Sequence, residues 1–178
     1  AAATANRRIV FAEGEDERVI RAAFAMLEDM TDMPVLIGRP EVIERRSDGI
    51  GLPKSFLSRL EIVNPEADTR YREYWETYHS VMERRGVTPD IAKAVMRTNT
   101  TAIGAVMVHR GEAESLICGT FGQYSWHLSY VRQMLETEDL QPHGALSLMI
   151  QNSGPLFIAD TQVFPEASAA EIAEIVRA

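Results

Sequence analysis

The sequence predicts an α/β protein with a doubly wound, mostly parallel sheet, flanking helices and an inserted helical segment. Three observations predict this class: β-branched runs alternate with helical patterns up to residue 65, a helical stretch follows over 68–110, and strand signals return after residue 113. Strands that alternate with helices pair in parallel through crossover connections. The composition agrees, since 46% of the 178 residues are hydrophobic and 25% are charged, as in ordinary globular proteins.

The N-terminal region contains three strand signals separated by helical ones. Residues 7–14, RRIVFAEG, form a β-branched run that ends at a glycine, and residues 15–30 follow with helical spacing. Acidic residues crowd the first turn of this helix, where they complement its partial positive charge, and we favour this capping role over metal binding. A second strand is expected at 33–40, running into a helix over 41–46, and a third strand at 60–65.

The stretch from 68 to 110 is expected to form three consecutive helices. The first ends at Gly86, which can serve as a C-cap. The second begins with Thr88 before Pro89, a residue that suits the first helical position. The apolar stripes of these helices are interpreted as core rather than as ligand contacts.

Two basic pairs end helices within this stretch. They are Arg84 with Arg85 and His109 with Arg110. Cations at a helix C-terminus complement its partial negative charge, so we favour capping over a phosphate contact for both pairs.

The C-terminal third returns to strand. A strand is expected at 114–119, two strands joined by an NSGP turn at 145–161, and an amphipathic helix at 168–178. Residues 1–6, AAATAN, are interpreted as a linker or an artificial remnant. The remaining residues, 7–178, are expected to belong to one domain.

The charge balance disfavours two classes of partner. The formal net charge is −8, from 18 Lys and Arg against 26 Asp and Glu. Without a basic stripe interleaved with aromatic residues, binding to nucleic acid or to an anionic membrane is not expected. No stretch approaches the roughly 18 apolar residues of a membrane span, and the first residues lack a signal-peptide pattern. We therefore expect a cytoplasmic protein that contacts neither nucleic acid nor membrane.

The chain offers little for metal or thiol chemistry. Cys118 is the only cysteine, which excludes an internal disulfide and suits a reducing compartment. It lies in the apolar run SLIC, so a buried structural thiol is favoured over a nucleophile. No metal site is expected, because metal-ligand spacing is lacking among the four histidines, His79, His109, His127 and His143. The sequence also lacks the two common glycine-rich nucleotide-binding motifs.

The segment CGTFGQYS, residues 118–125, joins the strand to the next helix. The first N–H groups of a helix lack internal partners, so such a junction can hold a phosphate. Its hydroxyl and aromatic side chains would suit a phosphate together with an adenine or thioester arm. The residues alone leave two interpretations open, a ligand site of this kind or plain strand-to-helix packing. The candidate ligand-binding residues are Gly119, Thr120, Gly122, Tyr124, Ser125, Trp126 and Arg132.

Several segments carry a family resemblance. RRIVFAEGEDERVIRAA, AIGAVMVHRGEAESLICGT and GPLFIADTQVFPEASAAEIAEIV resemble, in the same order, segments of the phosphate acetyltransferase/butyryltransferase family. The similarity runs from about Arg7 to Ala178. It implies a partial phosphotransacetylase-like fold, with residues 7–178 as the N-terminal half of the family's domain.

Details within the match resemble one branch of this family. Residues 78–131 are similar to the C-terminal domain of multidomain NADP-dependent malic enzymes. Active acetyltransferases read LRKHKG where this chain reads VMERRG, so Met82 stands in place of an arginine. A second arginine of the active enzymes falls on Ser129, and Arg132 one turn later could partly substitute for it. Guanidinium groups stabilise the charge of acyl transfer, so their loss predicts little catalysis.

The resemblance implies a regulatory and oligomerising domain that is itself non-catalytic. It would bind acetyl-CoA as an allosteric inhibitor and form a homo-oligomer. NADP and a divalent metal would serve a separate malic-enzyme half, which oxidatively decarboxylates malate to pyruvate. Two alternatives stay open: an active phosphate acetyltransferase, which converts acetyl-CoA and phosphate to acetyl phosphate and CoA, and a module that only mediates assembly.

Overall fold

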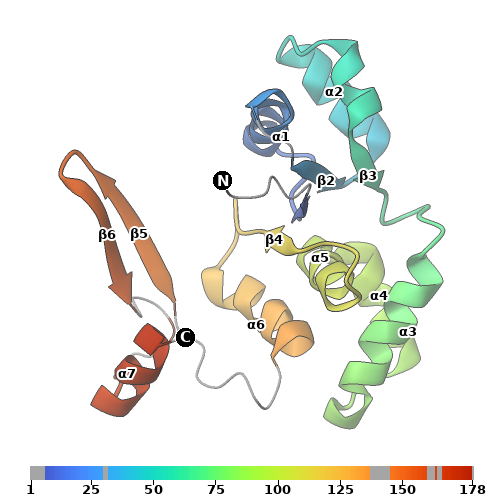
Figure 1. The fold of residues 1–178 in the computed structure, drawn as a ribbon. Coiled ribbons are helices and arrows are strands. Elements are labelled where there is room, and N and C mark those ends of the chain that lie inside the picture. The colour runs from blue at the N-terminus through green and yellow to red at the C-terminus, as the bar shows by residue number, and fades with distance from the viewer. Residues whose placement is uncertain (1–6, 30–31, 137–144, 160–162, 164–165, 178) are drawn as a thin grey trace. The chain divides into compact units, whose positions relative to one another are not determined.

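The computed structural model describes residues 7–29, 32–136, 145–159, 163 and 166–177 (Figure 1). The chain divides into two compact units, residues 1–135 and residues 136–178. The expectation of one domain over 7–178 stays a prediction.

The first unit contains a four-stranded parallel sheet. Its strands are β1 (Arg8–Phe11), β2 (Met33–Ile37), β3 (Glu61–Val63) and β4 (Ser115–Ile117). Their order in the sheet is β3-β2-β1-β4, and β1 pairs in parallel with both β2 and β4. The chain therefore moves outward from β1 to β3 and then returns to the other side of β1. This confirms the parallel α/β class predicted from the alternating strand and helix patterns.

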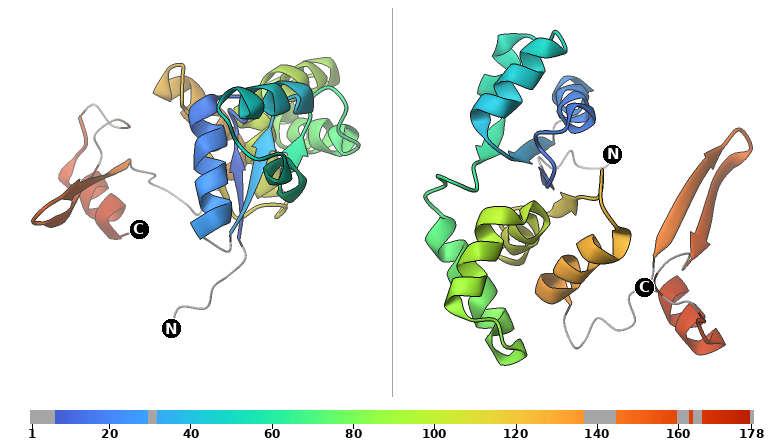
Figure 2. Two further views of the ribbon diagram at one scale, coloured as in Figure 1. Left: turned by 90° about the horizontal axis from the view of Figure 1, so that it is seen from above. Right: turned by 180° about the vertical axis from the view of Figure 1, so that it is seen from behind.

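Helices cover both faces of this sheet. They are α1 (Glu17–Asp29), α2 (Pro40–Gly49), α3 (Tyr71–Met82), α4 (Pro89–Thr98), α5 (Thr100–His109) and α6 (Tyr124–Leu135). The views in Figures 1 and 2 agree that α1 and α2 lie on one face, while α5 lies on the other. Two short 3₁₀ helices, η1 (Lys54–Arg59) and η2 (Glu83–Arg85), complete the unit, and η1 was not expected from the sequence.

Alternation along the strands builds a separate core on each face. Val10 and Val35 pack with α3, α4 and α5, whereas Phe11 and Leu36 pack with α1, α2 and η1. Successive side chains of a strand point to opposite faces, so strands covered on both sides are apolar at every position. Helix α5 supports this arrangement, since seven of its residues are buried: Thr101, Ala102, Ile103, Gly104, Ala105, Val106 and Met107.

The caps predicted at Gly86 and at Thr88 with Pro89 are confirmed. The Thr88 hydroxyl accepts the backbone N–H of Ile91, and Pro89 is the first residue of α4. Gly86 has a φ of 87° and ends η2 in the left-handed region, which a residue without a Cβ adopts at low cost. Asn99 caps α5 by accepting the N–H of Ala102.

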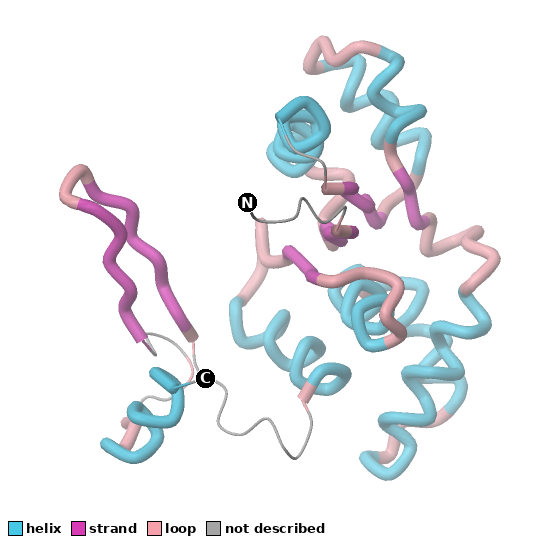
Figure 3. The backbone as a smooth tube through the Cα atoms, viewed as in Figure 1, coloured by secondary structure: helices cyan, strands magenta, loops and turns pink. Residues whose placement is uncertain are grey.

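The second unit consists of an antiparallel hairpin and a helix. Strands β5 (Leu146–Gln151) and β6 (Gly154–Ala159) are joined by a short turn, and α7 (Ala169–Arg177) follows (Figure 3). This confirms the two strands and the helix expected from the sequence. Within the described ranges, no helix is long and apolar enough to cross a membrane.

Candidate functional site

A cleft lies at the carboxyl ends of the parallel strands. It is lined by the segments that follow the strands, Ala12–Asp16 after β1, Ile37–Arg39 at the end of β2, Pro65 and Glu66 after β3, and Phe121 after β4. Its volume is about 360 Å³, and Arg46, Arg97 and Thr100 complete the lining. In open α/β sheets, ligands bind in the crevice outside the carboxyl ends of the strands, where the strand order reverses. In this sheet the order reverses between β1 and β4, so the cleft has the expected position.

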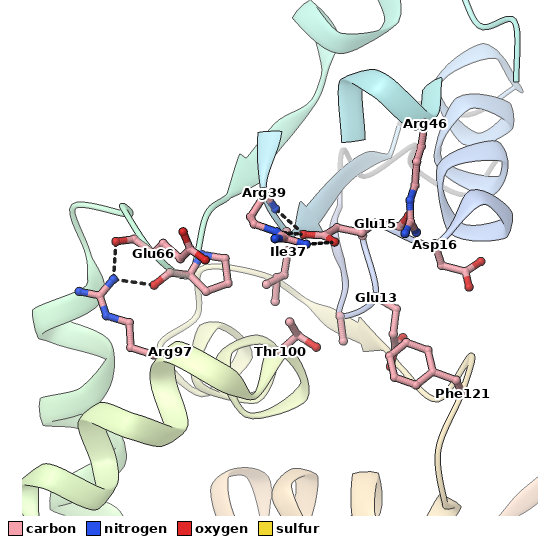
Figure 4. A pocket seen from close by; sticks show the side chains of 14 residues that line it. Glu13, Glu15, Asp16, Ile37, Arg39, Arg46, Glu66, Arg97, Thr100 and Phe121 are labelled. Atoms are coloured by element: carbon pink, nitrogen blue, oxygen red, sulfur yellow. Dashed lines mark hydrogen bonds and ion pairs between the residues drawn. The ribbon is translucent and has the colours of Figure 1, made fainter. Parts of the chain in front are cut away.

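Glu15 and Arg39 form an ion pair between the loops after β1 and β2 (Figure 4). The carboxylate of Glu15 accepts the Nε–H and Nη2–H of Arg39 at 2.9 and 3.0 Å and the Arg39 backbone N–H at 3.0 Å. The hydrogen bond from the Arg39 side chain holds the pKa of Glu15 below its usual value. Arg46 adds a hydrogen bond to the backbone carbonyl of Glu15. Both arginines are therefore engaged by the protein itself.

Arg97 is held on the opposite side of the cleft. Its Nη1 donates to the carbonyls of Pro65, at 2.8 Å, and of Glu66 (Figure 4). Its guanidinium also lies 3.6 Å from the ring centroid of Tyr71, within the range of a cation–π contact. Arg97 thus fixes the loop after β3 against α3 and α4.

Asp16 and Arg18 form a second ion pair at the start of α1. Asp16 caps this helix, because its Oδ1 accepts the backbone N–H of Arg18 at 2.8 Å. The Arg18 guanidinium donates to both carboxylate oxygens, at 3.0 and 2.9 Å, and lowers the pKa of Asp16 to about 2. It also donates to the carbonyl of Thr120 at 3.0 Å. Asp16 therefore caps the helix, as expected of this acidic run, and Arg18, which it pairs with, fixes the loop after β4.

Beneath the cleft, a buried polar network joins β1 to α6. Glu13 is 6% exposed, and its Oε1 accepts the backbone N–H of Gly119 at 3.0 Å. The same oxygen lies 3.8 Å from Nδ1 of His127, which is 4% exposed. Nδ1 of His127 lies 2.8 Å from the Thr101 hydroxyl, and Nε2 lies 2.8 Å from the Phe121 carbonyl oxygen. Buried polar groups need such partners, and this network supplies them.

Cys118 lies beside this network and is half-buried. Burial, with a further contribution from the negative charge of Glu13, raises the pKa of its thiol to about 11. The thiolate is the nucleophilic form, so the thiol is almost unreactive at neutral pH. This agrees with the interpretation of Cys118 as a structural residue.

The structure places the sequence-predicted site residues in the turn after β4 and on α6, and none of them lines the cleft. Gly119 and Gly122 have φ values of 95° and 91°, as the sharp turn requires. Tyr124 and Trp126 are each 46% exposed. A second, apolar hollow of about 310 Å³ is lined by Phe121, Gly122, Gln123 and Trp126.

The remaining predicted residues differ in how accessible they are to a ligand. Ser125 and Arg132 are exposed on α6. The Thr120 hydroxyl oxygen is buried without a hydrogen-bond partner among the described residues, so this side chain does not face an open site. Met82, which the family resemblance aligns with an arginine, is 5% exposed in the core, and the Ser129 hydroxyl donates to the carbonyl of Trp126.

Most of the cleft was not predicted from the sequence. Glu13, Glu15, Arg39, Arg97 and Thr100 line it but were treated as capping, strand or helix residues. One signal was available, because a charged or small residue follows each predicted strand and the carboxyl ends of parallel strands share one edge. Among the described residues, no group of three or more His, Cys, Asp or Glu side chains is arranged to hold a metal ion.

Sequence comparisons place the chain in a known family. A family described as phosphate acetyl/butaryl transferase matches residues 1–178. An NAD-dependent malic enzyme from Rhizobium meliloti is 48% identical over 96% of this chain and 22% of its own length. An NADP-dependent malic enzyme from Escherichia coli is 44% identical over 96% of this chain and 23% of its own length. A phosphate acetyltransferase from Synechocystis is 29% identical over 98% of this chain and 25% of its own length.

Solved structures agree on the fold. The EutD phosphotransacetylase from Staphylococcus aureus matches with a TM-score of 0.81 and 22% identity over 97% of this chain. A phosphotransacetylase from Streptococcus pyogenes matches with a TM-score of 0.83 and 24% identity over 96% of it. The chain spans 51% of each of these structures and less than a quarter of the two malic enzymes. By its fold and by its match over the whole chain, this protein belongs to the phosphate acetyl/butyryl transferase family and corresponds to the phosphotransacetylase-like portion of malic enzymes.

Proposed function

We propose that this chain is a regulatory module that binds a CoA thioester, acetyl-CoA, and mediates homo-oligomerisation. It would belong to a malic enzyme, whose oxidative decarboxylation of malate to pyruvate would be carried out by other residues of the longer protein. Acetyl-CoA would inhibit that distant site by favouring one of two global states, which requires a coupling energy of ~1–3 kcal/mol.

One observation carries the non-catalytic part of the proposal: the arginines of the cleft are already engaged. Arg39 donates to a carboxylate, and Arg46 and Arg97 donate to backbone carbonyls. Acyl transfer between CoA and phosphate places negative charge on a tetrahedral centre, and charged donors must be aimed at it. The two family arginines are replaced by Met82 and Ser129, and Met82 is buried. Losing one such donor typically costs about 10²–10³ in rate.

The junction fits the binding part of the proposal. CoA combines phosphates, a flat adenine and an apolar pantetheine arm. The first turn of α6 can supply backbone N–H groups to a phosphate, as helix N-termini commonly do. Phe121, at 65% exposed, and Trp126 offer aromatic faces beside the apolar hollow. A cleft of about 360 Å³ falls in the range of ordinary ligand sites, ~300–1,000 Å³.

NADP and a divalent metal are proposed only for the malic-enzyme residues outside this chain. The comparisons leave the coenzyme open, because the two malic enzymes are named as NAD-dependent and NADP-dependent. The role that we propose for this chain itself uses neither NAD nor NADP.

Calorimetric titration with acetyl-CoA tests the binding. Replacing Trp126 with alanine removes an exposed aromatic face of the hollow, so we expect at least a tenfold loss of affinity. The matched control is Trp75→Ala on α3, where the tryptophan packs against Lys93 and does not line the hollow. Absence of binding, or equal losses in both variants, would contradict the proposal.

The proposed oligomerisation has its own support in the hairpin. Leu148, Ile150 and Phe157 lie on one of its faces and are 52%, 86% and 58% exposed. Exposed apolar groups of this kind mark interaction surfaces. Sedimentation of the chain should therefore give a mass above that of the 19.9 kDa monomer, and Ile150→Lys should reduce it.

An active phosphate acetyltransferase is the second candidate, favoured by the relatives that bear this name and by the position of Arg132 one turn after Ser129 on α6. An assay of phosphate-dependent acetyl transfer by the full-length protein separates the two candidates. Robust formation of acetyl phosphate, abolished by Arg132→Ala, would support this alternative. Binding of acetyl-CoA without turnover supports the regulatory function.

A further inference from the structure

The imidazole of His127 is enclosed by the turn that joins β4 to α6. The ring is 4% exposed, although its neighbours along the helix, Trp126 and Ser129, are exposed. A Cβ placed on Gly122 would lie 3.1 Å from Nε2 of His127, and the φ of Gly122 is 91°. The turn therefore passes directly over the ring, at a distance that favours glycine.

Both ring nitrogens are engaged. Nε2 lies 2.8 Å from the carbonyl oxygen of Phe121. A carbonyl oxygen only accepts hydrogen bonds, so Nε2 must carry the hydrogen. Nδ1 of the neutral ring then accepts from the Thr101 hydroxyl, 2.8 Å away. The two partners fix both the tautomer and the orientation of the ring.

Three side chains hold three consecutive residues of the turn. Glu13 accepts the N–H of Gly119 at 3.0 Å, Arg18 donates to the carbonyl of Thr120 at 3.0 Å, and His127 donates to that of Phe121. They come from the loop after β1, from α1 and from α6. The backbone of the turn is thus fixed on three sides.

This arrangement fixes the backbone of Phe121 and leaves its side chain exposed. Its backbone is fixed, yet its side chain is 65% exposed and lines both the cleft and the apolar hollow. A histidine that is buried and hydrogen-bonded through both nitrogens cannot exchange protons with a ligand directly. Its hydrogen bond to Phe121 acts on the backbone of the turn alone.

We infer that His127 is a positioning residue, which fixes the 119–122 turn so that Phe121 forms the wall shared by the cleft and the apolar hollow. This inference deepens the proposed function and rests on it for the ligand, acetyl-CoA. Ligand affinity should then depend on the hydrogen at Nε2 and less on the contact at Nδ1.

Two substitutions separate the two ring nitrogens. In His127→Gln, the side-chain amide nitrogen reaches the position of Nε2 and can still donate to Phe121. In His127→Asn, the shorter amide overlaps Nδ1 and can meet only Thr101. We expect calorimetric affinity for acetyl-CoA within about threefold of the unaltered protein for the glutamine variant and at least tenfold weaker for the asparagine variant.

Hydrogen exchange of the free protein gives a readout that needs no ligand. Amides of residues 119–122 should exchange faster in His127→Asn than in His127→Gln, while those of the sheet stay unchanged. Equal exchange and equal affinity in the two variants would overturn the inference. If the unaltered protein binds no acetyl-CoA, the proposed function fails, whereas the exchange comparison still decides the role of His127.

Nitrogen chemical shifts of the imidazole test the same point without any substitution, so the test survives a variant that fails to fold. The inference requires a hydrogen on Nε2. A ring that carries its hydrogen on Nδ1 would leave the carbonyl of Phe121 without this donor and would overturn the inference.

Discussion

The parallel sheet and the hairpin contain strands of similar composition but opposite exposure. In β2, Val35, Leu36 and Ile37 are at most 1% exposed. In β5, Leu148 and Ile150 are 52% and 86% exposed. Both segments are apolar enough to form buried strands, so composition alone does not distinguish them.

The difference lies in what covers each strand. Each central strand of the sheet is flanked by other strands and has helices on both faces, and the two cores of the first unit bury both sets of side chains. In the second unit, the described residues form one pair of strands, β5 and β6, and one helix, α7. A two-stranded hairpin is marginally stable by itself. An apolar strand is therefore buried only when other elements of the fold pack against both of its faces.

The same substitution in the two regions gives the largest expected contrast. Leu36→Ala removes a fully buried side chain from β2, which should lower the free energy of unfolding by about 2–5 kcal/mol. At protein concentrations low enough to keep the chain monomeric, Leu148→Ala in β5 should change it by less than about 0.5 kcal/mol, because that side chain is half exposed in the single chain. Urea unfolding followed by circular dichroism measures both values. A cost above about 1.5 kcal/mol for Leu148→Ala would mean that the hairpin is covered in solution.

The sequence predicted most of this fold because each element carries its own local signal. Thr88 with Pro89 marks the start of α4, and Gly86 marks the end of the preceding segment, as the cap contacts confirm. The 3₁₀ helix η1 carries no comparable signal, and it depends on Phe56, which packs into the core from a distant segment. Elements defined by tertiary packing alone were the ones that sequence reasoning could not place.

The candidate site was harder to predict because it is assembled by the strand order. Glu13 and Gly119 are distant in sequence and meet only because β4 pairs with β1. A single sequence does not reveal which strand lies beside β1. His127 was noted only as a residue without metal-ligand spacing, since its burial depends on the turn that passes over it. The residues of the junction could be proposed because they are contiguous, and their role in binding stays a prediction.

The alkylation rate of a thiol depends on how deeply the thiol is buried, so it can be used to compare the packing of the sheet with that of the hairpin. Cys118 follows β4 and has a pKa raised to about 11, chiefly by burial, so about one thiol in a thousand is ionised at pH 8. A cysteine introduced at the exposed Gln151 of the hairpin should have an ordinary pKa. In the Gln151→Cys variant, alkylation at pH 8 should be about a hundredfold faster at the new thiol. Comparable rates, measured by mass spectrometry of the two peptides, would show that the sheet edge opens readily.

A glycine at the cleft should be far less tolerant than one on the surface. A Cβ on Gly14 would lie 2.7 Å from the carbonyl oxygen of Ile37 and 2.8 Å from the Cβ of Leu36. Gly14→Ala should therefore cost about 1–3 kcal/mol, because a strand must shift. Gly49→Ala is the matched control, since a Cβ there would meet nothing within 4 Å, and it should leave stability unchanged or higher by up to about 1 kcal/mol. Thermal melts of the two variants check this, and equal melting temperatures would contradict the close approach of the loop after β1 to β2.

Helix caps should give the smallest contrast, and acid should weaken the cap in each unit. Asp16 caps α1, and the Arg18 side chain lowers the pKa of its carboxyl to about 2. A depressed pKa means that its stabilisation is complete above the usual value, near 4, and is lost as the pH falls toward 2. In the second unit, Ser168 and Glu171 cap α7 reciprocally, and the hydrogen bond from the Ser168 side chain lowers the pKa of Glu171. That contribution is also lost below the usual carboxyl pKa.

Replacing Asp16 with alanine should lower the free energy of unfolding of the first unit by about 1 kcal/mol at pH 7. The loss should shrink as the pH falls from about 4 to about 2, because the unaltered protein loses the same contribution there. Ser168→Ala should reduce only the helicity of α7 and should leave the unfolding of the sheet unchanged, because this cap belongs to the other unit. Urea titrations at a series of pH values measure the first effect, and amide exchange in α7 measures the second. A loss for Asp16→Ala that stays constant down to about pH 2 would mean that the cap is held by the geometry of the loop and not by the charge of the carboxylate.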